Sequence, residues 1–580
     1  MKKIHSLFRV LFTVSLLLTG CSSGPGTESA SPPSVPSTPD RTARLFEWVG
    51  DKNYKSPKNE VINASSAVNQ STGLASDWYK DSTVYHIWVK SFNDYDGDGV
   101  GDFRGITAKL DYIKNDLGAD TIWLSPVFDC AGKGRTESFN MHGYDTTDYY
   151  AVNDYFGNEE QLLELLREAH KKGMKVIFDF VPNHTSSNNP WFLLSAKDED
   201  GKGAWYLWNE VRLPWSPMGN SNTWYFNINR QANYYGAFGS GMPDLNFRNY
   251  EVREEMKNVV RYWLNRGFDG VRIDAVRYML EDAGTGAQID RPGTHDFFNE
   301  LRTEVLDPYT ALGSPKFMVA EAWINGNRPA LQTYFGTDAK PEFQMLFDFD
   351  FSGQVSAAVK AKNSALFSTI QFWADRAVLK SGRSAFFLSN HDNLSSRPAS
   401  VYTNPAQLRL ATALELLAPA TPFIYYANEI GQADAAGYRG EDIRLRYKLD
   451  WKLEALEKAR PDSILNLHKA FIGARSLYPA LRRGAYGQVS SPDATVCAYT
   501  LSHEGKTVLC VFNLTGTPVD KIELTLAEGV PEGSWGTVIG TASVASGLSG
   551  GRKATLSGLP AYGFALCALG GGVVENLFAY

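Results

Sequence analysis

The chain has 580 residues, which is too long for one ordinary hydrophobic core, so several domains are expected. Its formal net charge of −7 argues against a nucleic-acid-binding protein. Apart from Cys21, the cysteines lack the paired spacing of a metal site and are too sparse for a disulfide scaffold. Cys497 and Cys510 flank a turn with an offset register, so no bridge between them is predicted.

The first forty residues have the pattern of an export signal followed by a tether. Basic residues precede a short apolar run at 10–18, which is too short to cross a bilayer comfortably. The run ends in Leu-Thr-Gly-Cys, which resembles a bacterial lipoprotein box and implies cleavage before Cys21, acylation of its thiol and anchoring of the exported protein to a bacterial membrane. An ordinary signal peptide with an incidental cysteine is the alternative. Residues 1–20 are thus a predicted lipoprotein signal peptide, and 21–40, rich in Ser, Pro and Gly, a flexible tether.

Residues 41–76 have no strong hydrophobic period and receive no assignment. From residue 83 onward, short apolar segments alternate with helical patterns, which is typical of parallel βα units. Eight such units over 77–480 predict an α/β fold, a closed (β/α)8 TIM barrel. The expected strands are 84–89, 120–124, 174–180, 270–274, 317–320, 343–349, 385–388 and 423–426.

Two further regions follow from the same pattern. The connection after the third strand, 184–250, is far longer than an ordinary loop and rich in Trp and Tyr, so we expect an inserted subdomain B whose core takes most of these rings. Residues 481–570 contain short strands between Gly-rich turns, expected at 496–500, 507–513, 521–526 and 562–568, which indicates an antiparallel β domain. Residues 571–580 are a predicted loose tail.

Carboxylates and histidines follow four of the expected strands. Barrel enzymes carry their chemistry at these strand ends. A single Asp there is commonly a helix N-cap, but four ends carrying Asp, Glu and His are hard to explain as caps. On the fourth strand, Arg272 and Asp274 lie two residues apart and therefore on one face. The guanidinium is expected to hold the pKa of Asp274 down, although a structural ion pair is the alternative.

The four strand ends carry a specific resemblance. DFVPNH, GFDGVRID, VAEAW and LSNHDN, in this order, resemble the signature regions of the α-amylase family of glycoside hydrolases. The likeness extends from Trp78 to about Ala480. It implies a catalytic barrel over 77–480, an inserted subdomain and a C-terminal β-sandwich.

The resemblance also implies roles for individual residues. Asp274 matches the nucleophile, Glu321 the general acid/base, and Asp392 the residue that holds sugar hydroxyls. A retaining glycosidase needs one anionic nucleophile and one proton donor. The apolar neighbours of Glu321 in the sequence are expected to raise its pKa. Around the substrate, the resemblance places the ring-stacking Tyr144, the supporting Asp179, the sugar-binding His184 and His391, and Arg272, which fixes Asp274.

An acidic loop after the first strand has the alternating oxygens and glycines of a calcium site. It lacks the Glu of an EF-hand and resembles the calcium loop of oligo-1,6-glucosidase-like members. The resemblance implies a structural Ca²⁺ site, and a solvated acidic turn is the alternative. A second calcium site known in many α-amylases uses a Lys-His pair, which is Arg277-Tyr278 here, so we do not predict that site. The implied ligands are Asp94, Asp96, Asp98, the Val100 carbonyl and Asp102.

Two short stretches bear on the substrate. The segment 242–246, Met-Pro-Asp-Leu-Asn, is intermediate between the oligo-1,6-glucosidase and neopullulanase forms of a fifth signature region. Ala275 follows the nucleophile position, where small residues accompany α-1,4 action. We therefore expect a monomeric hydrolase of α-1,4 bonds in maltodextrins or starch. The alternatives are a 4-α-glucanotransferase, an α-glucosidase or neopullulanase-type activity, and a non-catalytic glycan-binding surface protein.

Overall fold

The computed structural model describes residues 41–63, 74–134, 141–220, 222–377, 382–392, 396–437, 442–530, 533–540, 542–545 and 552–570. The predicted signal peptide, the tether with Cys21 and the tail at 571–580 lie outside these described residues. Within the described ranges, no helix has the length and apolar character needed to cross a membrane.

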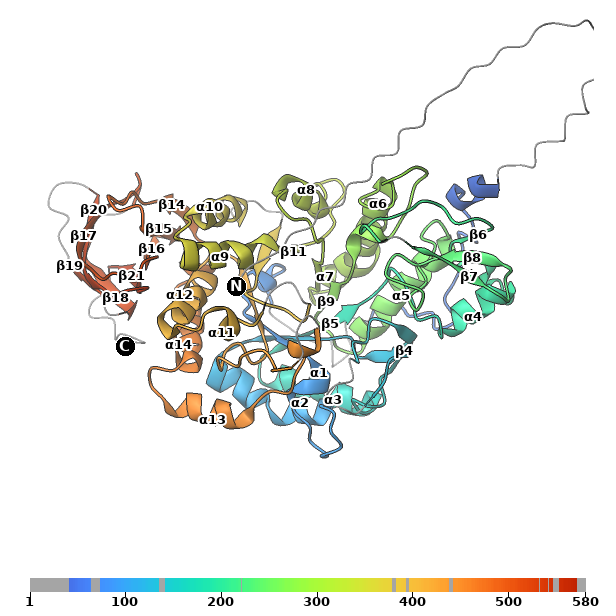
Figure 1. Cartoon of the computed structure of the whole chain (residues 1–580), viewed down its shortest axis with the longest axis horizontal. Coiled ribbons are helices and arrows are strands. Elements are labelled where there is room, and N and C mark those ends of the chain that lie inside the picture. Colours follow the sequence, from blue (N-terminus) through green and yellow to red (C-terminus); the bar gives the residue numbers. More distant parts are fainter. Residues whose placement is uncertain are drawn as a thin grey trace, which may run out of the picture. The chain divides into compact units, whose positions relative to one another are not determined.

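Eight parallel strands close into a barrel, which confirms the predicted fold (Figure 1). β1 closes the ring, because its Val84 pairs with Thr121 on one side and with Phe423 on the other. The strands in chain order are β1 (Val84–Ile87), β2 (Thr121–Leu124), β5 (Lys175–Phe180), β9 (Gly270–Ile273), β10 (Phe317–Ala320), β11 (Met345–Phe347), β12 (Arg383–Phe386) and β13 (Thr421–Tyr425).

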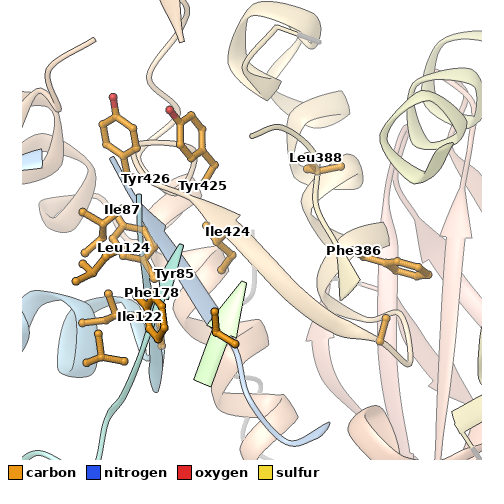
Figure 2. Packing of buried hydrophobic residues seen from close by; sticks show 14 of the residues in the cluster. Tyr85, Ile87, Ile122, Leu124, Phe178, Phe386, Leu388, Ile424, Tyr425 and Tyr426 are labelled. Atoms are coloured by element: carbon orange, nitrogen blue, oxygen red, sulfur yellow. The ribbon is translucent and has the colours of Figure 1, made fainter. Parts of the chain in front are cut away.

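Strand residues alternate between two cores, as the pleat of a β-strand requires. Rings of Trp123, Phe347 and Phe423, which come from strands that are not all neighbours, meet at centroid distances of 4.8–6.0 Å and fill the inside of the barrel. Their sequence neighbours Ile122, Leu124 and others belong to a separate cluster that packs toward the helices (Figure 2).

Helices cover the outside of the barrel. Several begin at an Asn whose side chain accepts a first-turn N–H, as Asn158 and Asn249 do. The helices are α1 (Val89–Phe92), α2 (Phe103–Ala108), α3 (Glu159–Lys171), α5 (Tyr250–Asn265), α6 (Pro292–Leu301), α7 (Asp307–Ala311), α8 (Arg328–Gln332), α9 (Asp350–Ala361), α10 (Ala365–Ala377), α11 (Pro398–Val401), α12 (Pro405–Leu416), α13 (Trp451–Ala459), α14 (Ile464–Leu477) and α15 (Ala480–Arg483).

The connection after β5 folds into a small subdomain. It contains α4 (Pro190–Lys197) and a three-stranded sheet of β6 (Trp208–Asn209), β7 (Trp224–Asn227) and β8 (Ala232–Tyr235). Trp215, Trp224 and Tyr235 are buried together in its core, whereas Trp205 and Tyr234 belong to the main hydrophobic cluster that extends around the barrel. Beside it lies an antiparallel ribbon of β3 (Phe128–Cys130) and β4 (Thr146–Val152), which we did not predict because β3 is short and irregular.

The unassigned N-terminal segment runs along α5. Val49 bridges to Asn249, the N–H of Glu60 donates to Asn258 Oδ1 at 2.9 Å, and the N–H of Asn63 donates to Asn265 Oδ1 at 2.9 Å. Scattered aromatic contacts add to these bonds, as where Trp48 stacks on Tyr250 at 5.2 Å. The segment has no periodic apolar face, which is why hydrophobic periodicity did not reveal its place.

The C-terminal domain is a sandwich of two antiparallel sheets, as predicted. Leu509 and Val511 of one sheet share a core with Ile522 and Leu556 of the other. Cys497 lies opposite Phe512 and Cys510 opposite Tyr499, which confirms that these two cysteines form no bridge. One sheet contains β14 (Ala485–Gln488), β15 (Val496–His503), β16 (Lys506–Asn513), β21 (Phe564–Leu569) and β18 (Trp535–Gly540); the other contains β17 (Val519–Thr525), β20 (Lys553–Leu559) and β19 (Ser543–Ala545).

Candidate active site

The predicted site residues lie at the carboxyl ends of the barrel strands. Asp274 follows β9 and its N–H donates to Phe180 O at 2.9 Å, while Glu321 follows β10 and its N–H donates to Ile273 O at 3.0 Å. The strand ladder therefore continues through both acids and holds their backbones against neighbouring strands. Parallel strands bring these ends to one mouth of the barrel.

A cavity of about 420 Å³ opens at this mouth. Six of the predicted site residues line it, namely Tyr144, His184, Asp274, Glu321, His391 and Asp392. The remaining lining residues were not predicted as site residues, and they are mainly apolar or aromatic: Met218, Phe238, Met242, Ala275, Tyr278 and Trp323. The volume and the mixture of apolar walls with a few convergent polar groups are typical of a small-molecule site.

The buried guanidinium of Arg272 joins three carboxylates. Its Nη1 donates to Asp179 Oδ1 at 2.7 Å and to Asp274 Oδ1 at 2.8 Å, and its Nη2 lies 3.0 Å from Glu321 Oε2. We grouped Arg272 and Asp179 with the substrate-binding residues, but neither lines the cavity and both are buried. They lie behind the cavity wall and act on the residues that face it.

Asp274 and Glu321, two of the three acids that contact Arg272, differ in acidity. Burial raises the pKa of the Asp274 carboxyl to about 6, although Arg272 lowers it. Burial also raises the pKa of Glu321 well above its usual value, again against the effect of Arg272. Arg272 does lower the pKa of Asp274, as predicted, but the net pKa is raised rather than low, because loss of solvation outweighs one guanidinium shared among three carboxylates. Near neutrality, Asp274 is the readier anion and Glu321 the readier proton donor.

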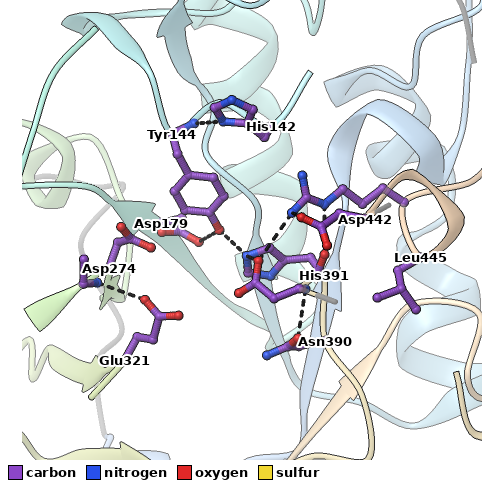
Figure 3. A network of polar contacts seen from close by, with 12 residues as sticks. His142, Tyr144, Asp179, Asp274, Glu321, Asn390, His391, Asp442 and Leu445 are labelled. Atoms are coloured by element: carbon purple, nitrogen blue, oxygen red, sulfur yellow. Dashed lines mark hydrogen bonds and ion pairs between the residues drawn. The ribbon is translucent and has the colours of Figure 1, made fainter. Parts of the chain in front are cut away.

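Tyr144 connects Asp179 with the histidine that precedes Asp392 (Figure 3). Its hydroxyl donates to Asp179 Oδ2 at 3.1 Å and lies 2.6 Å from His391 Nε2. The rings of Tyr144 and His391 stack at 5.4 Å and 13°. Burial lowers the pKa of His391 well below its usual value, so this imidazole is neutral and binds through hydrogen bonds rather than charge.

His184 lies on the cavity wall next to Tyr144. Its Nε2 is 3.1 Å from the Tyr144 carbonyl oxygen, and burial lowers the pKa of its imidazole to about 3. His184 is thus neutral as well. Its ring meets that of Phe238 at 5.1 Å, so a side chain of the inserted subdomain completes this wall.

Two contacts of the site escaped sequence analysis. Arg446 donates from Nε to His391 O at 2.9 Å, and its Nη2 lies 3.4 Å from Asp392 Oδ1. No motif marks this arginine. The N–H of Ala275 donates to Glu321 Oε2 at 2.9 Å, in a turn where Ala275 has φ 52°. That left-handed conformation costs an L-residue about 1–2 kcal/mol, so the rest of the fold must impose it.

The acidic loop brings three of its predicted ligands together. Oxygens of Asp94, Asp96 and Asp102 lie within 4.8 Å of one another. Asp98 is outside this group, and its Oδ1 accepts the N–H of Val100 at 2.8 Å. Convergent carboxylate oxygens fit a hard cation such as Ca²⁺. The Asp98 side chain turns to the backbone of its own loop, which alternation of residues in the sequence could not reveal.

Comparison with known proteins places the chain in a family. Residues 86–469 match the model of the α-amylase catalytic domain. The chain belongs to the α-amylase family of glycoside hydrolases. It is 32% identical over 467 residues to α-amylase 3 of Dictyoglomus thermophilum, covering 76% of this chain and 86% of that protein.

Two other matches show how broad this family is. The trehalose synthase/amylase TreS of Mycobacterium tuberculosis is 30% identical over 524 residues, covering 78% of this chain and 84% of that protein. The crystal structure of the α-amylase from H. orenii matches with a TM-score of 0.67 and 27% identity, covering 84% of this chain and 99% of that one. Family membership therefore establishes a glycoside hydrolase fold. It does not establish which glycosidic bond is cleaved, or whether water or a sugar hydroxyl accepts the glycosyl group.

Proposed function

We propose that this protein is a retaining hydrolase of α-1,4-glucosidic bonds in maltodextrins and starch. The observation that carries the proposal is the pair Asp274 and Glu321, bound to one guanidinium at the cavity wall and separated in pKa. A retaining glycosidase needs this division between an anion and a proton donor.

The proposed reaction has two steps. A carboxylate oxygen of Asp274 attacks the anomeric carbon while Glu321 gives its proton to the glycosidic oxygen, so the leaving chain departs as an alcohol and a glycosyl ester forms on Asp274. Glu321, now a carboxylate, then takes a proton from water, whose oxygen bonds to the anomeric carbon and releases Asp274. Arg272 orients both acids, and the Ala275 N–H binds Glu321 in either protonation state.

The other cavity residues bind the sugar in this proposal. Tyr144 presents its ring to the sugar face, and the neutral imidazoles of His184 and His391 exchange hydrogen bonds with hydroxyls. Asp392, held by Arg446, accepts from sugar hydroxyls and assists distortion of the ring. All the carboxylates needed for catalysis are present, which argues against a non-catalytic glycan-binding protein.

Covalent trapping tests the proposal. Glu321→Gln with α-maltotriosyl fluoride should accumulate a glycosyl-enzyme, because fluoride leaves without a proton and the second step lacks its base. Mass spectrometry of the peptide with Asp274 is expected to show the added trisaccharide. The matched variant Asp274→Asn/Glu321→Gln should remain unmodified. An unmodified Glu321→Gln enzyme, or an adduct on another residue, would refute the assignment.

The α-1,4 preference rests on Ala275 in the cavity wall and on the relatives named α-amylase. The intermediate form of residues 242–246 accompanies mixed activities and does not decide the bond. Products from maltoheptaose, pullulan and starch are the direct test. Rapid cleavage of isomaltotriose with slow cleavage of maltotriose would contradict it.

Transfer to a sugar acceptor is the second candidate, and a relative named trehalose synthase/amylase favours it. In that case a 4-α-glucanotransferase or isomerising reaction would use the same glycosyl-enzyme with a sugar hydroxyl in place of water. Pure maltotriose separates the two, since hydrolysis releases glucose and maltose, whereas transfer also produces longer oligomers.

We also propose an exported protein with a structural calcium ion. Acylation at Cys21 would anchor the enzyme to a bacterial membrane, where it would meet α-glucans outside the cytoplasm; loss of membrane association in Cys21→Ser tests this. Asp94, Asp96 and Asp102 would hold Ca²⁺ and stiffen the loop after β1, without a part in the chemistry.

A further inference from the structure

A second cavity, of about 370 Å³, lies on the outer side of the barrel between the N-terminal segment, β4, α4 and α5. It shares no lining residue with the active-site cavity. Figure 1 shows α4, α5 and β4 in the same part of the molecule. Aromatic rings dominate its walls, contributed by Tyr54, Tyr149, Tyr150, Trp191 and Trp205.

The ring of Trp191 is fixed in position at the cavity wall. It lies in the first turn of α4, where Asn189 Oδ1 accepts its backbone N–H at 2.8 Å. Its ring stacks on Tyr149 at 5.5 Å and 22° and meets Trp205 at 5.1 Å and 64°. The ring is half-buried, and its indole N–H donates to no group among the residues that the structure describes. A fixed ring with a free donor is a common platform for a ligand.

The buried carboxylate of Glu255 fixes a further part of the cavity wall. It accepts from Tyr54 Oη at 2.9 Å, Ser56 Oγ at 3.1 Å and Tyr150 Oη at 2.6 Å. Two of these residues belong to the N-terminal segment, so the segment that had no assignment from sequence becomes a structural wall of the cavity. Its ring positions are set before any ligand arrives.

The charges around the cavity indicate a neutral ligand. Three acids, Asp148, Asp200 and Glu255, line the cavity together with two lysines, so its charges nearly balance. The Nζ of Lys58 lies 5.5 Å from the Tyr150 ring centre, and that of Lys202 lies 3.8 Å from the Trp205 ring centre. These lysines already occupy the cation–π positions, which disfavours an external cation. A ring with apolar faces and hydroxyl edges matches both the aromatic walls and the mixed donors and acceptors.

We propose that this cavity binds a segment of an α-glucan chain as a second site, separate from the active site. The choice of α-glucan among sugars rests on the proposed function. The site would hold a long substrate on the enzyme while another part of the chain is cleaved, which raises the effective concentration of cleavable bonds. Short substrates cannot occupy both sites, so the second site would not change the rate at which they are cleaved.

Two variants test the site in a Glu321→Gln background, which prevents hydrolysis. Trp191→Ala removes the platform, and Leu194→Trp fills the cavity from the same helix. Trp48→Ala and Leu193→Trp are the matched controls, because both side chains are exposed and neither lines the cavity. We expect retardation in native gels containing amylopectin to weaken about tenfold in the two test variants, as the loss of an aromatic stack and its buried area implies. The controls should migrate as the parent does.

Kinetics separate this site from the active site. In the otherwise unmodified enzyme, Trp191→Ala and Leu194→Trp should keep maltotriose turnover, which also reports a correct fold, and raise KM for amylopectin. Unchanged retardation in both test variants, or equal losses on maltotriose and amylopectin, would overturn the proposal. If the protein cleaves no α-glucan, the proposed function fails, whereas the gel comparison of Leu194→Trp with Leu193→Trp still decides the second site.

Discussion

Two clusters of carboxylates differ in their surroundings. Asp274 and Glu321 are buried and share the guanidinium of Arg272. In the acidic loop, Asp94 is half-buried and Asp96 is exposed, and the oxygens of both accept backbone N–H groups. Within the described residues, no basic side chain pairs with Asp94, Asp96 or Asp102. Both clusters gather carboxylates, but the first buries both acids, whereas the loop buries only Asp102 of its three. Burial raises the pKa of Asp274 and of Glu321, while the loop gathers negative charge that a bound cation would offset.

The largest effect is expected at the buried acids. Asp274→Asn and Glu321→Gln should each lower kcat on maltotriose at least about 10³-fold, because a nucleophile or a proton donor is lost. Asp296→Asn, at a half-exposed acid on the barrel surface, is the control and should retain activity. If either active-site variant kept turnover near that of the parent, the replaced acid would not be catalytic, and the buried cluster would differ from the loop in burial alone.

Removal of the shared cation is expected to affect both stability and rate. Arg272→Gln leaves Asp179, Asp274 and Glu321 without their partner and should lower the free energy of unfolding by about 3–5 kcal/mol. Arg272→Lys keeps the positive charge but loses the planar set of N–H donors that contacts several carboxylates at once. We therefore expect it to lower kcat more than the free energy of unfolding. Urea denaturation and kinetics measure the two effects. Arg266→Gln, at a partly exposed pair with Glu159, should cost less than about 1 kcal/mol.

The pH profile should reflect the two raised pKa values. Protonation of Asp274 below about pH 6 removes the nucleophile, so kcat/KM should fall as pH drops through that value. Ionisation of Glu321 removes the proton donor, so kcat/KM should fall again at high pH. With α-maltotriosyl fluoride, the first step of Glu321→Gln should lose the alkaline limb and keep the acidic one. An acidic limb near about pH 4, the value of a solvated carboxyl, would show that burial does not control Asp274.

The smallest effect is expected at the acidic loop. Ca²⁺ at about one hundred times its Kd should add about 2.7 kcal/mol to the free energy of unfolding, which chelator removes and thermal unfolding reports. Asp94→Asn should abolish most of this gain. Asp98→Asn should preserve more of it, because Asp98 lies outside the converging group. Equal losses in both variants would favour the ligand set expected from sequence over the one in the structure, and no response to Ca²⁺ would contradict the site.

Sequence reasoning located residues that follow buried strands and failed where position depends on distant packing. Asp274 and Glu321 were found because each follows an apolar strand, where parallel strand ends meet, and because both lie in segments that resemble the signature regions of the family. By contrast, the apolar walls Met218 and Phe238 come from the inserted subdomain, where no period tells which side chains face the barrel. The pKa of Asp274 was misjudged because desolvation depends on the whole surrounding fold. The strands β14, β18, β19 and β20 were also missed, although Ala554 and Leu556 of β20 alternate with less buried residues.

Barrel closure by β1 and β13 has a consequence for biogenesis. Val84 can pair with Phe423 only after the ribosome has produced nearly the whole catalytic domain. Until then β1 and β12 both present unpaired edges, which attract other strands and promote aggregation. Contacts this distant in sequence also form slowly. A chain truncated before residue 421 would therefore form an open sheet that is prone to aggregation rather than a smaller enzyme.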